Sequence, residues 1–121
     1  MDTTTDLLKL KSGEFDEGKC WFTRRGNVLT IGITQPTVDG LGEIESLELP
    51  EEGDRFSVGD ILLTLEGSSD TVEVEAICDG VVLDVNLSSR NIEIAVEKLE
   101  DPMEEGWILK IQMDTPALDH S

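Results

Sequence analysis

Basic residues are scarce in this chain of 121 residues. It contains 9 lysines and arginines against 27 aspartates and glutamates, which gives a formal net charge of −18. A protein this acidic repels the phosphates of nucleic acids and of anionic membrane surfaces. We therefore expect neither nucleic acid nor membrane as a partner, and we expect a protein partner.

Long apolar runs are also missing. The longest aliphatic stretches, such as Ile61–Leu63 and Val81–Leu83, are far shorter than the ~20 residues that a membrane-spanning helix needs. Residues 1–6 show neither the basic nor the apolar region of a secretory signal. The length matches a single domain. We expect a soluble, cytoplasmic, single-domain protein.

Residue types that carry catalysis or bind metals are few. His120 is the single histidine, and the chain has no Cys-x-x-Cys and no Gly-x-Ser-x-Gly motif. In a reducing cytosol Cys20 and Cys78 are expected to be thiols packed as small apolar side chains, although the sequence leaves a disulfide or a redox pair open. We expect no enzyme activity, no catalytic residue and no metal site.

Acidic residues are dense between positions 43 and 54. Their spacing lacks the alternating ligand loop of a calcium-binding EF-hand. We interpret them as a solvated face that aids solubility and attracts basic partners. This acidic face consists of Glu43, Glu45, Glu48, Glu51, Glu52 and Asp54.

Short alternating apolar runs predict a mainly β fold with about seven strands. Val72 and Val74, for example, alternate with polar residues on both sides. Around Ser69 the sequence is nearly symmetrical, because Gly59 and Gly80 lie at almost equal distances from it. We therefore expect two strand-turn units flanking a projecting hairpin. The predicted strands are 20–23, 28–34, 43–49, 61–65, 71–76, 81–86 and 107–113.

Two helices are predicted between the strands. Pro36 in a first turn starts a short helix after the first hairpin. The second begins at Ser88 or Ser89 and ends before Pro102. Its apolar face is expected to contain Ile92, Ala95, Val96 and Leu99.

We divide the chain into a polar N-terminal segment (1–18), a domain (19–113) and a polar tail (114–121). Within the first segment, the apolar residues form either a helical turn or an edge strand. They are Leu7, Leu8 and Leu10.

Four blocks of sequence, in order, resemble the glycine cleavage system H protein family: residues 21–34, 41–54, 80–86 and 105–111. In the second block the family has leucine-glycine-aspartate, a strand, leucine-proline and glycine-aspartate. The resemblance covers residues 20–113 and implies the lipoyl/biotinyl-type hybrid of two antiparallel sheets, a flattened barrel-sandwich with a C-terminal helix. The periodicity of the strands agrees with this fold.

The resemblance also implies a site at the tip of the central hairpin, where family members carry lipoate on a lysine through an amide. The family reads roughly glutamate-serine-valine-lysine-alanine there. In this chain the lysine position is Ser69, and the five lysines (9, 11, 19, 98 and 110) lie elsewhere. We therefore expect no bound lipoate and no other cofactor. The flanking residues are Glu66, Gly67, Ser68 and Asp70.

The favoured function is a non-lipoylated, H-protein-like binding or regulatory module that interacts with a lipoate-dependent or related multienzyme system. The alternative is a lipoyl carrier of glycine cleavage, or of a related redox system, with an atypical attachment site. An enzyme or ligand-binding protein on the same scaffold has no support in the motifs. Ser68 and Ser69 are chemically able to accept phosphate, whereas phosphopantetheine usually needs Asp-Ser-Leu at the start of a helix.

Overall fold

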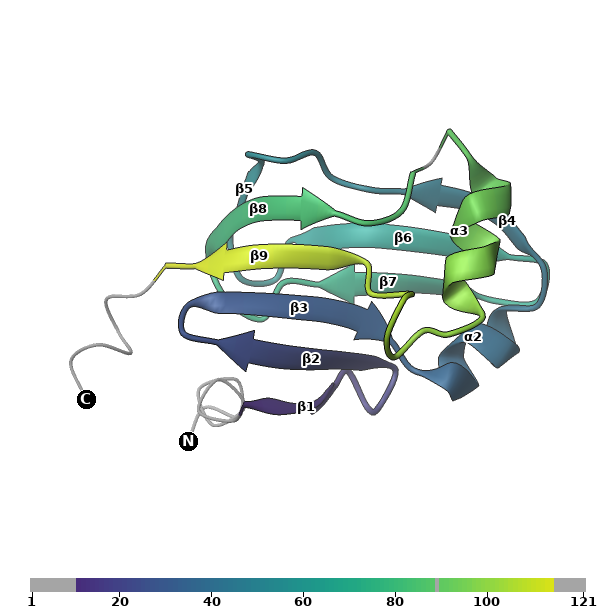
Figure 1. Ribbon diagram of the computed structural model, residues 1–121, viewed down its shortest axis with the longest axis horizontal. Helices are drawn as coiled ribbons and strands as arrows, with labels where there is room; N and C mark the ends of the chain where they lie inside the picture. Colours follow the sequence, from purple (N-terminus) through teal and green to yellow (C-terminus); the bar gives the residue numbers. More distant parts are fainter. Residues whose placement is uncertain (1–10, 89, 115–121) are drawn as a thin grey trace.

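The computed structural model describes residues 11–88 and 90–114, which form two antiparallel sheets and two helices (Figure 1). The larger sheet has the strand order β1-β2-β3-β9-β8-β5, and the smaller has the order β4-β6-β7. This architecture confirms the predicted fold class. The strands are β1 (Ser12–Phe15), β2 (Cys20–Arg25), β3 (Val28–Ile33), β4 (Ile44–Glu48), β5 (Arg55–Phe56), β6 (Ile61–Gly67), β7 (Thr71–Glu75), β8 (Gly80–Val85) and β9 (Leu109–Met113).

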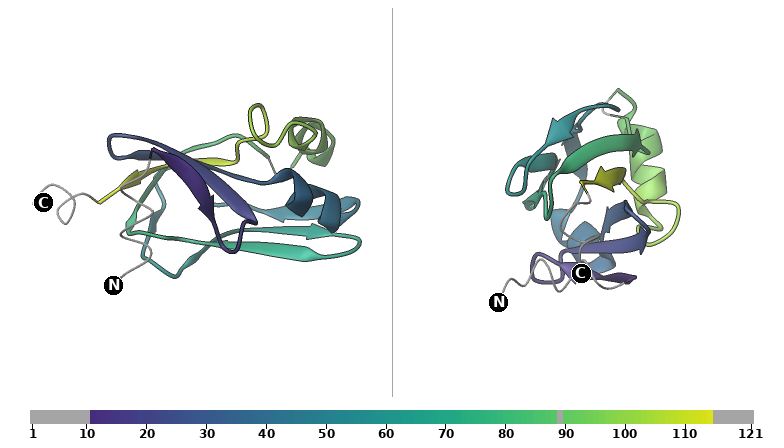
Figure 2. Two further views of the ribbon diagram at one scale, coloured as in Figure 1. Left: turned by 90° about the horizontal axis from the view of Figure 1, so that it is seen from below. Right: turned by 90° about the vertical axis from the view of Figure 1, so that its left-hand side faces the viewer.

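Two helices lie at one end of the sheets. The short helix α2 (Gln35–Leu41) follows the first hairpin and has Pro36 in its first turn, as predicted. Helix α3 (Ile92–Leu99) follows β8. Figures 1 and 2 place both helices at the end of the molecule where β6 turns into β7. Neither described helix is long and apolar enough to cross a membrane.

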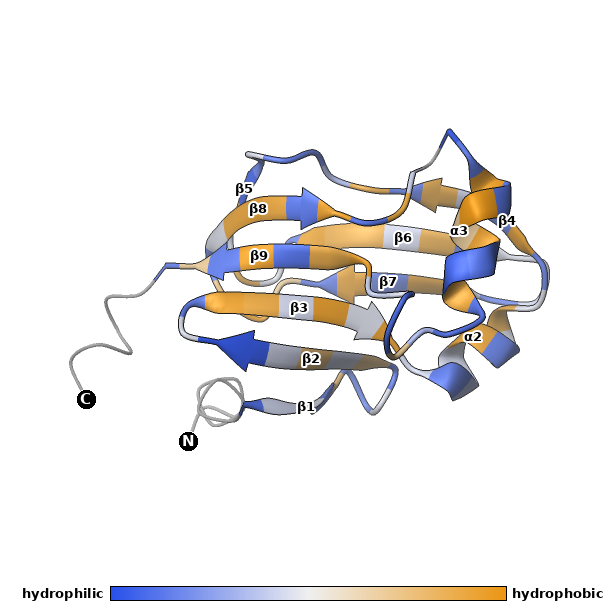
Figure 3. Ribbon diagram, in the orientation of Figure 1, coloured by the Kyte–Doolittle hydropathy of each residue, from blue (hydrophilic) through white to orange (hydrophobic). Residues whose placement is uncertain are grey.

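The two sheets face each other and enclose one apolar core (Figures 2 and 3). On β7 the side chains of Val72 and Val74 are buried, whereas those of Thr71, Glu73 and Glu75 are exposed. This alternation confirms the pattern expected for a strand with one side in the core. On the other side of the core, buried side chains of β3, β8 and β9 pack inward from the larger sheet.

Two crossings between the sheets produce the predicted symmetry of the central region. Strand β5 leads through residues 57–60 into β6, and β7 leads through residues 76–79 into β8. Two backbone hydrogen bonds join the crossings. Gly59 N donates to Ala76 O at 2.9 Å, and Ala76 N donates to Asp60 O at 2.8 Å. The hairpin β6–β7 therefore extends from a closed base.

The indole of Trp21 fastens the segment after α3 to the larger sheet. Its Nε1 donates to Ile33 O at 3.1 Å and to Pro102 O at 2.9 Å. Gly32 leaves room for the indole, because a Cβ at this position would lie 2.5 Å from the ring. These contacts help to fix α3 at the helical end.

Several local predictions differ from the structure. Strand β1, which pairs with β2, lies in the polar N-terminal segment, at residues where no strand was predicted. The N-cap of α3 is Asn91, whose Oδ1 accepts from Ile94 N at 3.3 Å, so the expected cap at Ser88 or Ser89 is wrong. An amide oxygen serves as well as a hydroxyl at this position.

The ends of two predicted strands also differ. Strand β3 ends at Ile33, and Thr34 turns inward, where its buried hydroxyl donates to Gly18 O at 2.8 Å. Strand β9 begins at Leu109, two residues later than expected, so Trp107 lies outside the ladder. The residues singled out in the sequence that lie outside the described residues are Leu7, Leu8, Lys9, Leu10, Ser89 and His120.

Candidate functional site

The end of the β6–β7 hairpin holds the residues at the expected family site. Strand β6 ends at Gly67 and β7 begins at Thr71, which leaves Ser68, Ser69 and Asp70 as an exposed turn. Asp70 closes the turn: its backbone oxygen accepts from Gly67 N at 2.9 Å, and its carboxylate accepts from Thr71 N at 2.8 Å. We call residues 68–70 the hairpin turn.

Hydrogen bonds join the hairpin turn to the connection between α2 and β4. Ser69 N donates to Leu41 O at 2.9 Å, and Ser68 N donates to Glu43 O at 2.8 Å. Glu43 N in turn donates to Ser68 Oγ at 3.0 Å. Three hydrogen bonds thus hold the turn against the C-terminal end of α2, so the predicted projecting tip is a fixed part of the body.

Two glycines permit this close contact. Gly42 has a φ of 74°, in the left-handed region that favours glycine. A Cβ at Gly42 would lie 2.6 Å from Ser68 Oγ and 2.8 Å from Ser69 Oγ. A Cβ at Gly67 would overlap the carbonyl oxygen of Leu41. The sequence indicated turn-forming glycines here, but it held no sign that the two turns touch.

Amide-linked lipoate needs a primary amine, and the hairpin turn presents the hydroxyl of Ser69 where the resemblance leads us to expect the family's lysine. The residues of this turn therefore do not fit a lipoyl group held through an amide. The oxygen of Ser68 accepts a hydrogen bond from Glu43 N. No neighbouring base among the described residues is shown to activate either serine, so the turn has no arrangement for nucleophilic catalysis.

Two lysines near the helical end are engaged by other groups. Lys98 Nζ donates to the backbone oxygen of Asn86 at 2.8 Å and to its Oδ1 at 3.0 Å. Lys110 Nζ lies 4.9 Å from the centroid of the Trp107 ring, within cation–π range. The exposed lysines of the described residues are Lys11 and Lys19.

Both cysteines are free thiols, as predicted. Burial and, to a smaller extent, the charge of Asp16 raise the pKa of Cys20 to about 12. Burial and the charges of Asp79 and Asp114 raise the pKa of Cys78 to about 11. Both thiols are therefore protonated at neutral pH and are poor nucleophiles.

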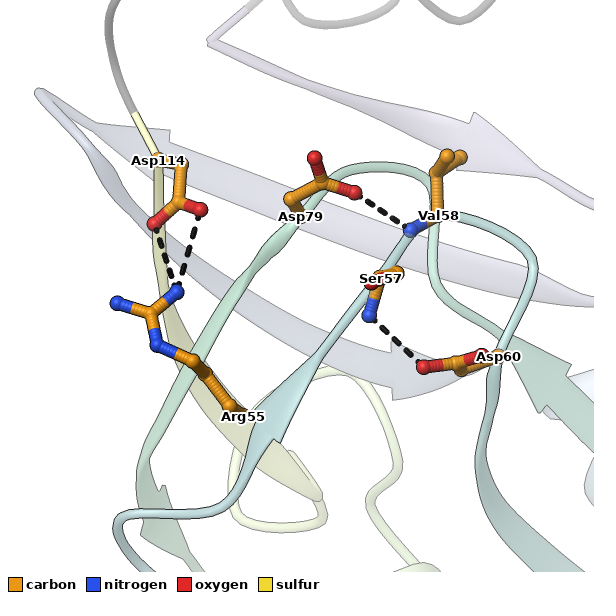
Figure 4. A network of polar contacts seen from close by, with 6 residues as sticks. All are labelled: Arg55, Ser57, Val58, Asp60, Asp79 and Asp114. Atoms are coloured by element: carbon orange, nitrogen blue, oxygen red, sulfur yellow. Dashed lines mark hydrogen bonds and ion pairs between the residues drawn. The ribbon is translucent and has the colours of Figure 1, made fainter.

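The carboxylates at the opposite end of the hairpin stabilise turns (Figure 4). Asp60 accepts a hydrogen bond from Ser57 N at 2.8 Å, and Asp79 accepts one from Val58 N at 2.8 Å. The exposed ion pair beside them joins Arg55 and Asp114. Across the described part of the chain, no group of three His, Cys, Asp or Glu residues is arranged to hold a metal ion.

The predicted acidic face is a feature of the folded surface. All six of its carboxylate residues, between positions 43 and 54, are exposed or partly exposed. The face begins at Glu43, beside the hairpin turn, and follows β4 to the turn before β5. It therefore supplies negative charge next to the candidate site.

Comparison with known proteins identifies the family. A family model described as glycine cleavage H-protein matches residues 13–121. The glycine cleavage system H protein of Acaryochloris marina is 41% identical over 93 residues, which cover 76% of this chain and 70% of the relative. The probable H protein of Aeropyrum pernix is 31% identical over 111 residues, which cover 92% of this chain and 76% of that one.

A solved structure agrees in fold. The crystal structure of a glycine cleavage system H protein from Mycobacterium marinum superposes with a TM-score of 0.70 and 22% sequence identity. The match covers 85% of this chain and 84% of the other. This likeness supports the sandwich of two sheets with its two helices.

The family match corrects the expectation about the cofactor. From Ser69 we inferred that the chain carries no cofactor. However, glycine cleavage H proteins are lipoyl carriers, and the family match includes the hairpin with its serine. One side chain was too narrow a basis for that inference. The family's members are not themselves catalysts, which confirms the non-enzymatic expectation, and they interact with the enzymes of glycine cleavage. This chain belongs to the glycine cleavage H-protein family.

Proposed function

We propose that this chain is a noncatalytic docking protein of glycine cleavage or of a related lipoate-dependent multienzyme system. The observation that supports the proposal is the hairpin turn. Ser68, Ser69 and Asp70 are exposed where we expect the family's lysine position, and the turn is hydrogen-bonded to the body of the protein. A turn held in one shape loses little conformational entropy when a partner binds.

The surface charge supports the same function. Glu43 of the acidic face is hydrogen-bonded to the hairpin turn, and the rest of the face leads away from it along β4. Negative charge at this end would steer an enzyme with a basic docking surface and speed its association. The family's decarboxylase and aminomethyltransferase are the partners that we propose.

The proposal is tested by measuring how tightly the purified chain binds the glycine decarboxylase and the aminomethyltransferase of its own cell. Ser69→Trp adds bulk to the exposed turn, and we expect it to weaken binding by about tenfold or more. Ser57→Trp is the matched control, because Ser57 is an exposed serine in the turn that precedes β6, at the other end of that strand. Equal affinities of the two variants would contradict docking through the hairpin turn.

A second function, lipoyl carrying from an atypical lysine, follows from membership of a carrier family. Lys19 favours it, because this exposed amine directly follows a tight turn in which Asp16 and Glu17 have positive φ angles. Intact-mass spectrometry of the native protein tests it. The mass increase of one lipoyl group, lost in Lys19→Arg and kept in Lys11→Arg, would support Lys19 as the site.

Lipoyl carrying and docking are separable in these experiments. An unmodified mass from cells that lipoylate their other carriers would contradict the second function. It would leave the binding measurements with the two enzymes as the test of docking.

A further inference from the structure

An open groove of about 710 Å³ lies between α2 and α3, beside the start of β4. We call it the α2–α3 groove. Apolar side chains from all three elements line it: Val38, Ile44, Ile92, Val96 and Leu99. The groove also reaches Gly42, the residue that touches the hairpin turn.

Part of the apolar surface of α3 remains uncovered in this groove. Ile92, Ala95, Val96 and Leu99 were predicted to share one apolar face, and of these four only Ala95 and Leu99 are buried. Val96 is 38% exposed and lines the groove. Apolar area left in water forgoes roughly 25 cal/mol per Å² of stabilisation, so a partner that covers it gains this free energy.

Acidic side chains accompany the apolar ones on both sides of the groove. Those from the α2 and β4 side are Asp39 and Glu43, and those from α3 are Glu93, Glu97 and Glu100. All five residues are exposed, and the lining contains no lysine or arginine. Within residues 11–88 and 90–114, no ion pair involves these carboxylates, although Asp39 accepts a hydrogen bond from Gln35 Nε2 at 2.9 Å.

We propose that the α2–α3 groove binds a basic amphipathic helix of a partner protein. The apolar stripe of that helix would cover Val96 and Ile44, and its lysines or arginines would pair with the acids on both sides. Charge complementarity favours a basic helix over an acidic or neutral one, because only a basic helix would pair with the flanking carboxylates. The inference rests on the proposed docking function and specifies the kind of partner surface that would bind, a basic amphipathic helix.

A designed peptide provides the first test. The probe is a synthetic helix of about 16 residues with leucines at i, i+4 and i+7 and lysines on both flanks. We expect saturable binding, measured by fluorescence anisotropy, that weakens by about tenfold or more when salt rises from ~0.05 to ~0.5 M. The same peptide with glutamates in place of the lysines should not bind, and its equal binding would overturn the proposal.

Variants of α3 locate the peptide. Val96→Glu places a charge in the groove, whereas Ile94→Glu makes the same kind of change at a residue that is 48% exposed, on the same helix and outside the lining. We expect Val96→Glu to weaken binding at least about tenfold and Ile94→Glu to stay within about twofold. Equal effects would overturn the proposal.

Charge variants keep the test valid should Val96→Glu fail to fold. Glu93→Lys with Glu97→Lys reverses two charges in the groove, and Glu73→Lys with Glu75→Lys reverses two exposed charges on β7. The two double variants change the net charge equally, so we expect only the first to weaken peptide binding by about tenfold. Equal weakening would show general attraction to an acidic protein and would overturn the proposal.

The outcomes separate this inference from the proposed function. Enzyme binding that depends on Ser69, together with no peptide binding, would overturn the groove alone. Peptide binding that depends on Val96, together with no binding to either enzyme, would overturn the proposed function alone.

Discussion

The Lys98 ammonium donates hydrogen bonds to both oxygens of Asn86, to the backbone carbonyl at 2.8 Å and to Oδ1 at 3.0 Å. The Asn86 side-chain amide donates in turn to Glu105 O and Trp107 O, at 2.8 and 2.7 Å. A lysine of α3 is thereby joined to the segments that follow β8 and precede β9. These bonds hold α3 in place beside the groove.

Replacement of Lys98 by Met keeps the aliphatic stem and removes the amine. We expect the free energy of unfolding to fall by about 1.5–3 kcal/mol, because hydrogen bonds from a charged, half-buried donor are lost. Urea denaturation measures the change. Lys11→Met, at an exposed lysine, should stay within about 0.5 kcal/mol. An unchanged midpoint for Lys98→Met would argue against this role of Lys98.

Replacement of Gly42 by Ala should loosen the hairpin turn. The new Cβ would meet the hydroxyls of Ser68 and Ser69 and would occupy a left-handed backbone position, for a total cost of about 1–3 kcal/mol. Gly53→Ala is the control, since Gly53 has a φ of 89° but no atom within 4 Å of the position that a Cβ would take. Gly42→Ala should be the more destabilising of the two in thermal unfolding; the reverse order would contradict the close contact.

Replacement of Trp21 by Phe removes the donor that holds Ile33 O and Pro102 O. Two buried carbonyl oxygens lose a partner, so we expect a loss of about 1–3 kcal/mol in the free energy of unfolding. Hydrogen exchange should also rise around Gly106, in the segment after α3. Unchanged exchange there would show that the indole does not fasten this segment.

The two thiols should react slowly and in a fixed order. With a pKa of about 11 against about 12, Cys78 should be labelled before Cys20 by a thiol reagent, and both rates should rise with pH up to these values. Mass spectrometry of tryptic peptides measures the order. Faster labelling of Cys20 would contradict the buried environment found for it.

The same pKa shifts predict a loss of stability in alkali. Each thiol has its pKa raised from 9.0 on folding, so the folded state holds its proton more tightly than the unfolded state. The stabilisation is complete below pH 9 and falls as pH rises toward 11 and 12. Cys20→Ala should flatten this decline in denaturation curves measured between about pH 8 and 10.5, and an unchanged slope would contradict the assignment.

Local patterns in the sequence predicted much of the fold. Alternation around Val72 and Val74 reflects a strand with one side in the core, and Pro36 marks the first turn of a helix. The symmetry about Ser69 corresponds to the two crossings at the base of the hairpin. These features are local, so neighbouring residues were enough to predict them.

Features that depend on distant contacts were missed. The bond between Glu43 N and Ser68 Oγ joins residues 25 positions apart, and nothing in either segment alone predicts it. The apolar spacing in α3 predicts one apolar face, but the neighbouring elements leave Val96 of that face uncovered. Helical periodicity shows which side chains share a face and does not show what covers them.

The most direct test of docking at the hairpin turn is calorimetric titration of the 121-residue chain with the glycine decarboxylase and the aminomethyltransferase of its own cell. We predict saturable binding to at least one enzyme, weakened by Ser69→Trp and retained by Ser57→Trp. Absence of binding to both enzymes at micromolar concentrations, with the chain shown to be folded, would contradict the account.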